Sequence, residues 1–86
     1  MPRISAFYGI VITMYFDDHE VPHFHARYAG DTASIAIATG AVLAGRLPRR
    51  ALRLARSWAV AHRGELELNW HRARRNVPLV PIAPLP

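Results

Sequence analysis

The chain has 86 residues, of which 51% are apolar and spread along its length, as is typical of one small folded domain. It contains no cysteine, which excludes disulfides, thiolate metal sites and a cysteine nucleophile. The formal net charge is +5 and every basic side chain is arginine, so the chain is suited to phosphate or carboxylate partners without favouring either.

The chain shows no signal for secretion or membrane insertion. Residues 1–5 lack the apolar region of a signal peptide, and no apolar run approaches the roughly 18 residues of a membrane span. We therefore expect a cytoplasmic protein that does not contact membranes. Residues 1–76 are expected to form a single domain and residues 77–86 a proline-rich tail.

Four strands are predicted in the first half of the chain. The first covers Ile4–Phe16, where β-branched and aromatic residues alternate and Gly9 marks a bulge. The others are His23–Tyr28, Ala33–Ala38 and Ala41–Ala44, joined by short glycine-containing turns. Consecutive strands with tight turns form an antiparallel meander.

A single long helix is predicted over Arg49–Arg75, after Pro48, a residue that suits a first helical turn. Its apolar stripe can cover one face of the sheet. Gly64 weakens the helix by about 1 kcal/mol relative to alanine, so a kink or a break could occur there. The predicted fold class is α+β, a four-stranded antiparallel meander packed on one long C-terminal helix. The tail favours polyproline II and either straps back across the domain or docks on another chain.

The most concentrated group of titratable residues lies between the first two predicted strands. It holds three of the five histidines and three of the six carboxylates: Asp17, Asp18, His19, Glu20, His23 and His25. His23 and His25 are two residues apart on a strand, so both leave from one face while Phe24 leaves from the other. Larger apolar residues favour the Phe24 face for the core.

Three interpretations of this group remain open. His19, His23 and His25, with the neighbouring carboxylates, could bind Zn²⁺ or another divalent metal ion. The same three histidines could instead be catalytic, acting as acid and base on a phosphodiester while Arg27 stabilises the developing charge. The third interpretation is a half-exposed sheet face whose histidines only satisfy local hydrogen bonds.

Arginines are concentrated around the start of the predicted helix, where Arg49, Arg53 and Arg56 share one exposed side. Together with Arg27, the residues predicted to bind nucleic acid or a protein partner are Arg46, Arg49, Arg50, Arg53 and Arg56. Such a side suits DNA or RNA phosphates, an acidic protein, or solvent alone. No aromatic residue alternates with these arginines and no known base-reading motif is present, so contact with nucleic acid would be to the backbone.

Several segments resemble a known family: Phe7-Tyr8-Gly9-Ile10, Asp18-His19, Pro22-His23-Phe24-His25-Ala26 and Leu47-Pro48-Arg49-Arg50-Ala51-Leu52. They resemble the DUF4160 family of small bacterial proteins of unknown function. The resemblance covers nearly the whole chain, although its alanine-rich third strand departs from the expected pattern. Members are often encoded beside DUF2442 proteins, an arrangement that is read as a candidate toxin–antitoxin pair. The resemblance therefore implies a cognate DUF2442-like partner, but it carries over no catalytic or binding residues.

Two functions are consistent with these observations. The leading hypothesis is a small cytoplasmic toxin–antitoxin-type component that binds a protein partner and nucleic acid through its arginine-rich helix. The alternative is a histidine-dependent RNase or phosphodiester hydrolase, with or without a metal ion, centred on the His-x-His strand. Association with a second copy of the chain is compatible with either hypothesis.

Overall fold

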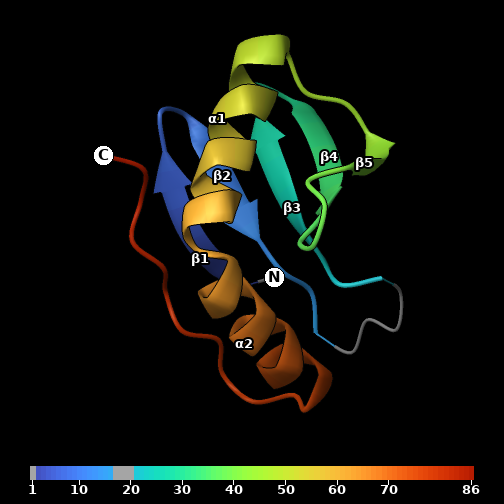
Figure 1. The fold of residues 1–86 in the computed structure, drawn as a ribbon, viewed down its shortest axis with the longest axis vertical. Coiled ribbons are helices and arrows are strands. Elements are labelled where there is room, and N and C mark those ends of the chain that lie inside the picture. The colour runs from blue at the N-terminus through green and yellow to red at the C-terminus, as the bar shows by residue number, and fades with distance from the viewer. Residues whose placement is uncertain (1, 17–20) are drawn as a thin grey trace.

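The computed structural model describes residues 2–16 and 21–86, which form one antiparallel sheet and two helices (Figure 1). The strands lie in the sheet in chain order: β1 (Arg3–Phe7), β2 (Ile10–Thr13), β3 (His23–Tyr28), β4 (Asp31–Ala36) and β5 (Val42–Gly45). The helices are α1 (Arg49–Ala61) and α2 (Arg63–Arg74). The α+β class with an antiparallel sheet is confirmed, but the prediction of four strands and one long helix is wrong.

The additional strand arises because the first predicted strand is a hairpin. Tyr8 and Gly9 both have positive φ, 49° and 81°, as in the two-residue turns that join antiparallel strands. Phe7 therefore pairs with Ile10, and Gly9 is part of a turn rather than a bulge. The register does shift in this hairpin, but between Arg3 and Ser5. Because the residues on both sides of the turn are apolar, the sequence pattern predicts one continuous strand instead of two.

The predicted single helix is broken at His62, where the backbone leaves the helical region at φ −121° and ψ 26°. The N–H of His62 still donates to the carbonyls of Trp58 and Ala59, so α1 ends with its last turn hydrogen-bonded. Gly64 lies in the first turn of α2 and has the low helix propensity expected near a break. As a result α2 runs in a different direction from α1 (Figure 1).

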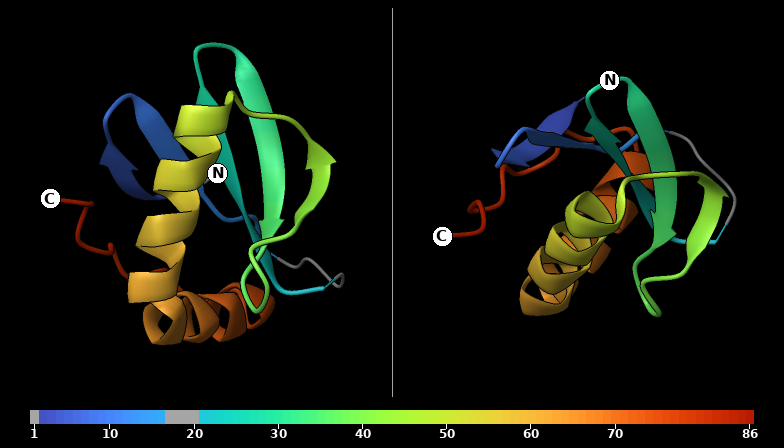
Figure 2. Two further views of the ribbon diagram at one scale, coloured as in Figure 1. Left: turned by 45° about the horizontal axis from the view of Figure 1, so that its top comes forward. Right: turned by 90° about the horizontal axis from the view of Figure 1, so that it is seen from above.

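Both helices lie on one side of the sheet, and the hydrophobic core fills the space between them and the strands (Figure 2). Phe24 is fully buried with its ring centroid 5.8 Å from that of Trp58, so the core is on the face of β3 that was predicted. Phe7 packs 5.4 Å from the same indole ring. The largest fully buried side chains are Trp58, Phe24, Ile4, Ile10, Ile12, Met14, Ile35, Leu66 and Asn69.

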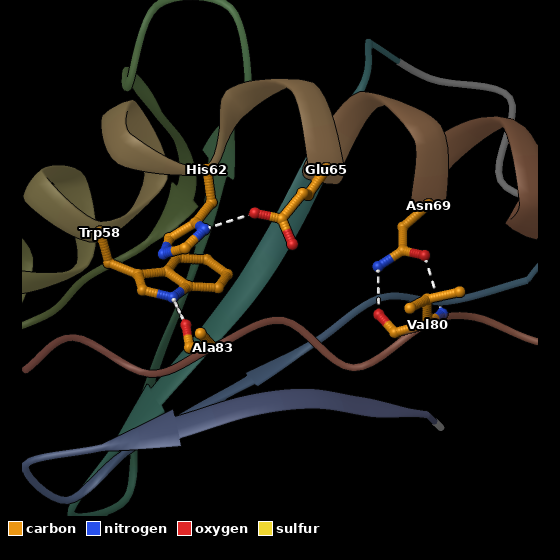
Figure 3. A network of polar contacts seen from close by, with 6 residues as sticks. All are labelled: Trp58, His62, Glu65, Asn69, Val80 and Ala83. Carbon is orange, nitrogen blue, oxygen red and sulfur yellow. Dashed lines mark hydrogen bonds and ion pairs between the residues drawn. The ribbon is translucent and has the colours of Figure 1, made fainter.

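The proline-rich tail packs back on its own domain, which was one of the two predicted alternatives. The side chain of Asn69 accepts a hydrogen bond from the Val80 N–H at 2.9 Å and donates one to the Val80 carbonyl at 2.8 Å (Figure 3). The indole N–H of Trp58 donates to the Ala83 carbonyl at 2.8 Å. Within the described ranges, neither helix is long and apolar enough to cross a membrane.

Candidate functional site

The helices lie over one side of the sheet (Figure 2), and a group of polar side chains lies on the opposite face. The strand register places Thr13 beside His25 and His25 beside Ser34, and it pairs Arg27 with Thr32. Because Phe24 and Ala26 point into the core, the alternating residues of β3 point to the other face. We call this group the bare-face patch, and its members are Thr13, Tyr15, His25, Arg27, Thr32 and Ser34.

The bare-face patch encloses a small hollow of about 140 Å³, lined by all of its members except Ser34. The ring of Tyr15 meets the His25 imidazole edge-on, with centroids 4.4 Å apart. Ser34 Oγ lies 3.4 Å from His25 Nδ1. Hydroxyl, imidazole and guanidinium groups can all donate hydrogen bonds, so the chemistry of the hollow suits an oxyanion such as a phosphate group.

His23 lies at the start of the same strand but is buried, with 4% of its surface exposed. Its Nδ1 is 2.6 Å from the Val21 carbonyl oxygen, and since a carbonyl only accepts, Nδ1 carries the proton and donates it. In a neutral ring Nε2 is then the basic nitrogen. The His23 ring lies between Trp70 of α2, at 5.3 Å, and His25, at 5.1 Å between centroids.

The two histidines of β3 are thus neighbours, while the third predicted member of the group cannot be placed. His19, together with Asp17, Asp18 and Glu20, falls outside the described residues. Among residues 2–16 and 21–86, no three His, Asp or Glu side chains come together in a way that could hold a metal ion. A metal site that includes His19 therefore stays a prediction.

A second candidate site lies on α1, where three of the predicted arginines share one exposed side of the helix. We call Arg49, Arg53 and Arg56 the arginine ridge. Their side chains border an open hollow of about 690 Å³, which is also lined by Leu52, Ser57 and Val60. Pro48 begins the helix and no acidic residue lies in its first turn, so nothing on α1 itself neutralises these charges.

Arg56 fixes the orientation of the ridge relative to the sheet. Its Nε donates to the Gly40 carbonyl at 2.7 Å, in the turn between β4 and β5. Gly40 has a positive φ of 75°, and a side chain placed there would meet the aliphatic part of Arg56 at 3.6 Å. This end of the ridge therefore lies beside the turn between β4 and β5, and Arg46 directly follows β5 in the sequence.

The described carboxylates do not balance this charge. They are Asp31, Glu65 and Glu67, and Glu65 pairs with His62 at 2.6 Å (Figure 3). No other ion pair joins two side chains that both lie within residues 2–16 and 21–86. The guanidinium groups of the arginine ridge therefore have no carboxylate partner among these residues.

The six arginines predicted to bind a partner do not form one surface. Arg49, Arg53 and Arg56 lie together, whereas Arg27 belongs to the bare-face patch on the other side of the sheet. Arg50 points to a third region, where it lines a small hollow with Tyr8 and Tyr28. The helical period explains this separation, because Arg50 is one residue from Arg49 and so lies about 100° around the helix.

Several residues of these sites could not be identified from the sequence. Thr13, Thr32 and Ser34 join His25 only through the strand register, which a single sequence does not fix. Gly40 matters because its carbonyl accepts from Arg56, a contact between residues that lie far apart along the chain. Polar residues alternate in β4, which indicates that they share one face of the sheet. The sequence alone does not show which strand lies beside β4, so it could not place them next to His25.

The chain matches the model of a protein family described as a domain of unknown function, DUF4160, over residues 9–71. This match covers β2 to most of α2 and includes both candidate sites. No curated protein and no solved structure matches the chain. The sequence belongs to the DUF4160 family, and the predicted family resemblance is confirmed.

Proposed function

We propose that this DUF4160 protein is a small binding component of a toxin–antitoxin-type pair, and that its arginine ridge binds the phosphate backbone of nucleic acid. The observation that carries the proposal is the arrangement of Arg49, Arg53 and Arg56 on one exposed side of α1, around a hollow of about 690 Å³. These arginines have no carboxylate partner among the described residues. The cognate protein, which the family resemblance implies, would be a DUF2442-like chain.

The spacing of the ridge suits a phosphate backbone. From Arg49 to Arg56 the helix rises by about 10 Å at 1.5 Å per residue. That length corresponds to roughly three phosphates of one strand at about 3.4 Å per nucleotide along a duplex axis. Arginine presents a planar fork of donors that remains charged at any physiological pH, so each residue can bind one phosphate. Contacts of this kind position nucleic acid without reading its sequence.

The salt dependence of binding tests this function. For a duplex, three phosphate contacts give a slope of about −2.7 in a plot of log affinity against log salt concentration. This slope corresponds to a roughly 40-fold loss of affinity between 50 and 200 mM salt. In the Arg49→Ala/Arg53→Ala variant the slope should fall to about −0.9, because only one ridge contact remains. Fluorescence anisotropy with a labelled duplex and a labelled single strand measures both.

The matched control is Arg74→Ala/Arg75→Ala, which removes the same charge from exposed positions at the end of α2. It should leave the slope close to that of the wild type. If both double variants reduce the slope equally, binding depends on net charge alone and the ridge has no specific part. If neither binds differently from the wild type, the arginine ridge is not the nucleic-acid site.

The bare-face patch supports a second candidate function, a histidine-dependent phosphodiester hydrolase. His25 shares its hollow with Arg27 and the hydroxyls of Thr13 and Thr32, and the His23 ring is 5.1 Å from it. One imidazole could remove a proton from the attacking hydroxyl while the other protonates the leaving oxygen, and Arg27 would stabilise charge on the phosphate.

Cleavage of a fluorophore-quencher RNA distinguishes this function from simple binding. A hydrolase of this kind should lose at least about 100-fold in rate in His25→Ala, since acid–base groups typically contribute 10²–10⁴-fold. Arg49→Ala/Arg53→Ala should affect binding far more than the rate at saturating RNA. Metal content of protein purified without a histidine tag, compared with His23→Ala/His25→Ala, tests the metal-dependent version. Undetectable cleavage by the folded wild type with and without divalent ions would rule the hydrolase out.

A further inference from the structure

The C-terminal tail pairs with one edge of the sheet, at β1, whereas the opposite edge, at β5, is exposed. On the β1 edge, the N–H of Ile82 in the tail donates to the Ile4 carbonyl at 2.8 Å, and Ile82 is buried. Four prolines in residues 77–86 have no N–H to offer to another strand. The tail thus closes the β1 edge against further pairing, which is one way that proteins protect edge strands.

The β5 edge has no such cover among the described residues. All four residues of β5 are exposed, and Val42 and Leu43 present apolar side chains that are 36% and 46% exposed. Figures 1 and 2 show β5 at the rim of the sheet, outside the area over which the helices lie. In an antiparallel ladder about half of the backbone groups of an edge strand point away from the sheet, where they can pair with an added strand.

Positive charge flanks both ends of this open edge. Arg56 is hydrogen-bonded to Gly40 in the turn that enters β5, and Arg46 follows Gly45, the last residue of the strand. The rest of the arginine ridge continues along α1 on the same side. An extended chain lying beside β5 would therefore have a guanidinium group near each of its two ends.

We propose that the β5 edge is a docking site for an extended acidic segment of a partner protein, which adds to the sheet as a sixth strand. Backbone pairing would supply affinity, as in other cases of strand addition, and carboxylates of the segment would pair with Arg46 and the arginine ridge. An apolar residue of the segment would cover Leu43, the more exposed of the two apolar side chains of β5. β5 has four residues and its pairing with β4 is irregular between Val42 and Ala44, so the paired part of the segment would be short.

Other occupants fit these observations less well. A second copy that paired β5 with β5 would bring two sets of the same arginines together, and each chain already carries a net charge of +5. Nucleic acid would satisfy the arginines, but it could neither continue the backbone ladder nor cover the apolar side chains. An acidic polypeptide satisfies the charge, the ladder and the apolar surface together.

This inference does not depend on the proposed nucleic-acid function, because backbone pairing at β5 requires no phosphate contact. Where both hold, the acidic segment and the phosphates compete for the arginine ridge. Binding of the partner would then lower the affinity for nucleic acid, as expected if one protein of a pair regulates the other. The two ideas are separable, since one is read from anisotropy of labelled nucleic acid and the other from protection of β5 amides.

The test uses the full chain and three probes. The first is a blocked peptide of about eight residues that alternates glutamate and valine, within the usual length of a strand. The second is the same peptide N-methylated at every residue, so that neither of its edges has an N–H; it retains its charge but cannot form a ladder. The third is polyglutamate. Amide hydrogen exchange read by NMR reports protection of the β5 residues, and titration reports affinity.

The expected result is that the Glu/Val peptide protects amides of β5 and binds at least about tenfold more tightly than either other probe. Leu43→Asp should weaken the peptide about tenfold by placing a carboxylate at the edge. Leu68→Asp makes the same change at an exposed site on α2 and should leave affinity within about twofold.

Four outcomes would overturn the proposal. One is no binding of the Glu/Val peptide at low salt, and another is equal binding of all three probes, which would mean that charge alone is recognised. The third is β5 protection that rises with protein concentration without peptide, which would assign the edge to a second copy. The fourth is equal protection of β5 amides by an RNA or DNA strand.

Discussion

Asn69 is the residue through which α2 holds the C-terminal tail, so its replacement by alanine should detach the tail from the domain. The side chain is fully buried and makes two hydrogen bonds with the backbone of Val80, at 2.8 and 2.9 Å. Each such bond contributes about 1 kcal/mol net, so Asn69→Ala should lower the free energy of unfolding by about 2 kcal/mol. For a domain of this size that corresponds to a melting temperature lower by about 8–16 °C.

Thermal unfolding followed by circular dichroism measures the stability, and hydrogen exchange at the Ile82 amide measures whether the tail remains paired with β1. Arg72→Ala is the matched control, because it removes only the 3.0 Å bond from Arg72 to the Asn69 side chain and leaves both bonds to Val80. It should lower the free energy of unfolding by less than about 1 kcal/mol. An unchanged melting temperature in Asn69→Ala, with the Ile82 amide still protected, would refute the assignment of Asn69 as the anchor.

Three further substitutions test separate parts of the fold by urea unfolding. Gly45→Ala would place Cβ 2.0 Å from the Thr32 carbonyl oxygen at a φ of +73°. We therefore expect the free energy of unfolding to fall by at least about 2 kcal/mol and the amides of β5 to exchange faster. Asparagine tolerates a positive φ, so Gly45→Asn should be equally unstable if the close approach to Thr32 dominates. Gly64→Ala meets no atom within 4 Å and should stabilise α2 by about 0.5–1 kcal/mol; a loss of stability would mean that the break at His62 requires glycine. Ser5→Ala removes a buried hydroxyl that has no hydrogen-bond partner among the described residues, so the change should be neutral or stabilising by up to about 1 kcal/mol. A loss above that size would indicate a partner for Ser5.

The class of the fold could be predicted because hydrophobic periodicity is a local property of the sequence. Alternation in the first half and a 3.6-residue stripe in the second half were enough to predict an antiparallel sheet packed on helix. The number of elements could not be predicted, because turn formation at Tyr8-Gly9 requires a positive φ at Tyr8 that its residue type does not favour. The pairing of Phe7 with Ile10 across the turn and the hydrogen bond from the Tyr8 hydroxyl to the Pro86 carbonyl stabilise that conformation, and both depend on the folded chain.

The candidate sites were predictable to a different extent. The face of β3 that carries His25 and Arg27 followed from alternation, and the shared side of Arg49, Arg53 and Arg56 followed from the helical period. The hydroxyl groups around His25 did not follow, since they belong to β2 and β4 and reach it through the register. The link from Arg56 to Gly40 likewise depends on how the helix sits on the sheet.

The positions of the two sites allow their functions to be separated by experiment. The arginine ridge is on the exposed side of α1, and the bare-face patch is on the opposite face of the sheet, so the buried core lies between them. Substitutions at such distant sites usually combine additively, within about 0.5 kcal/mol. If one nucleic-acid strand contacted only the ridge, His25→Ala would leave its affinity unchanged in both the wild-type and the Arg49→Ala/Arg53→Ala backgrounds. A non-additive combination would instead require a ligand that reaches both faces. The double-mutant cycle therefore decides whether the two sites serve one ligand or two.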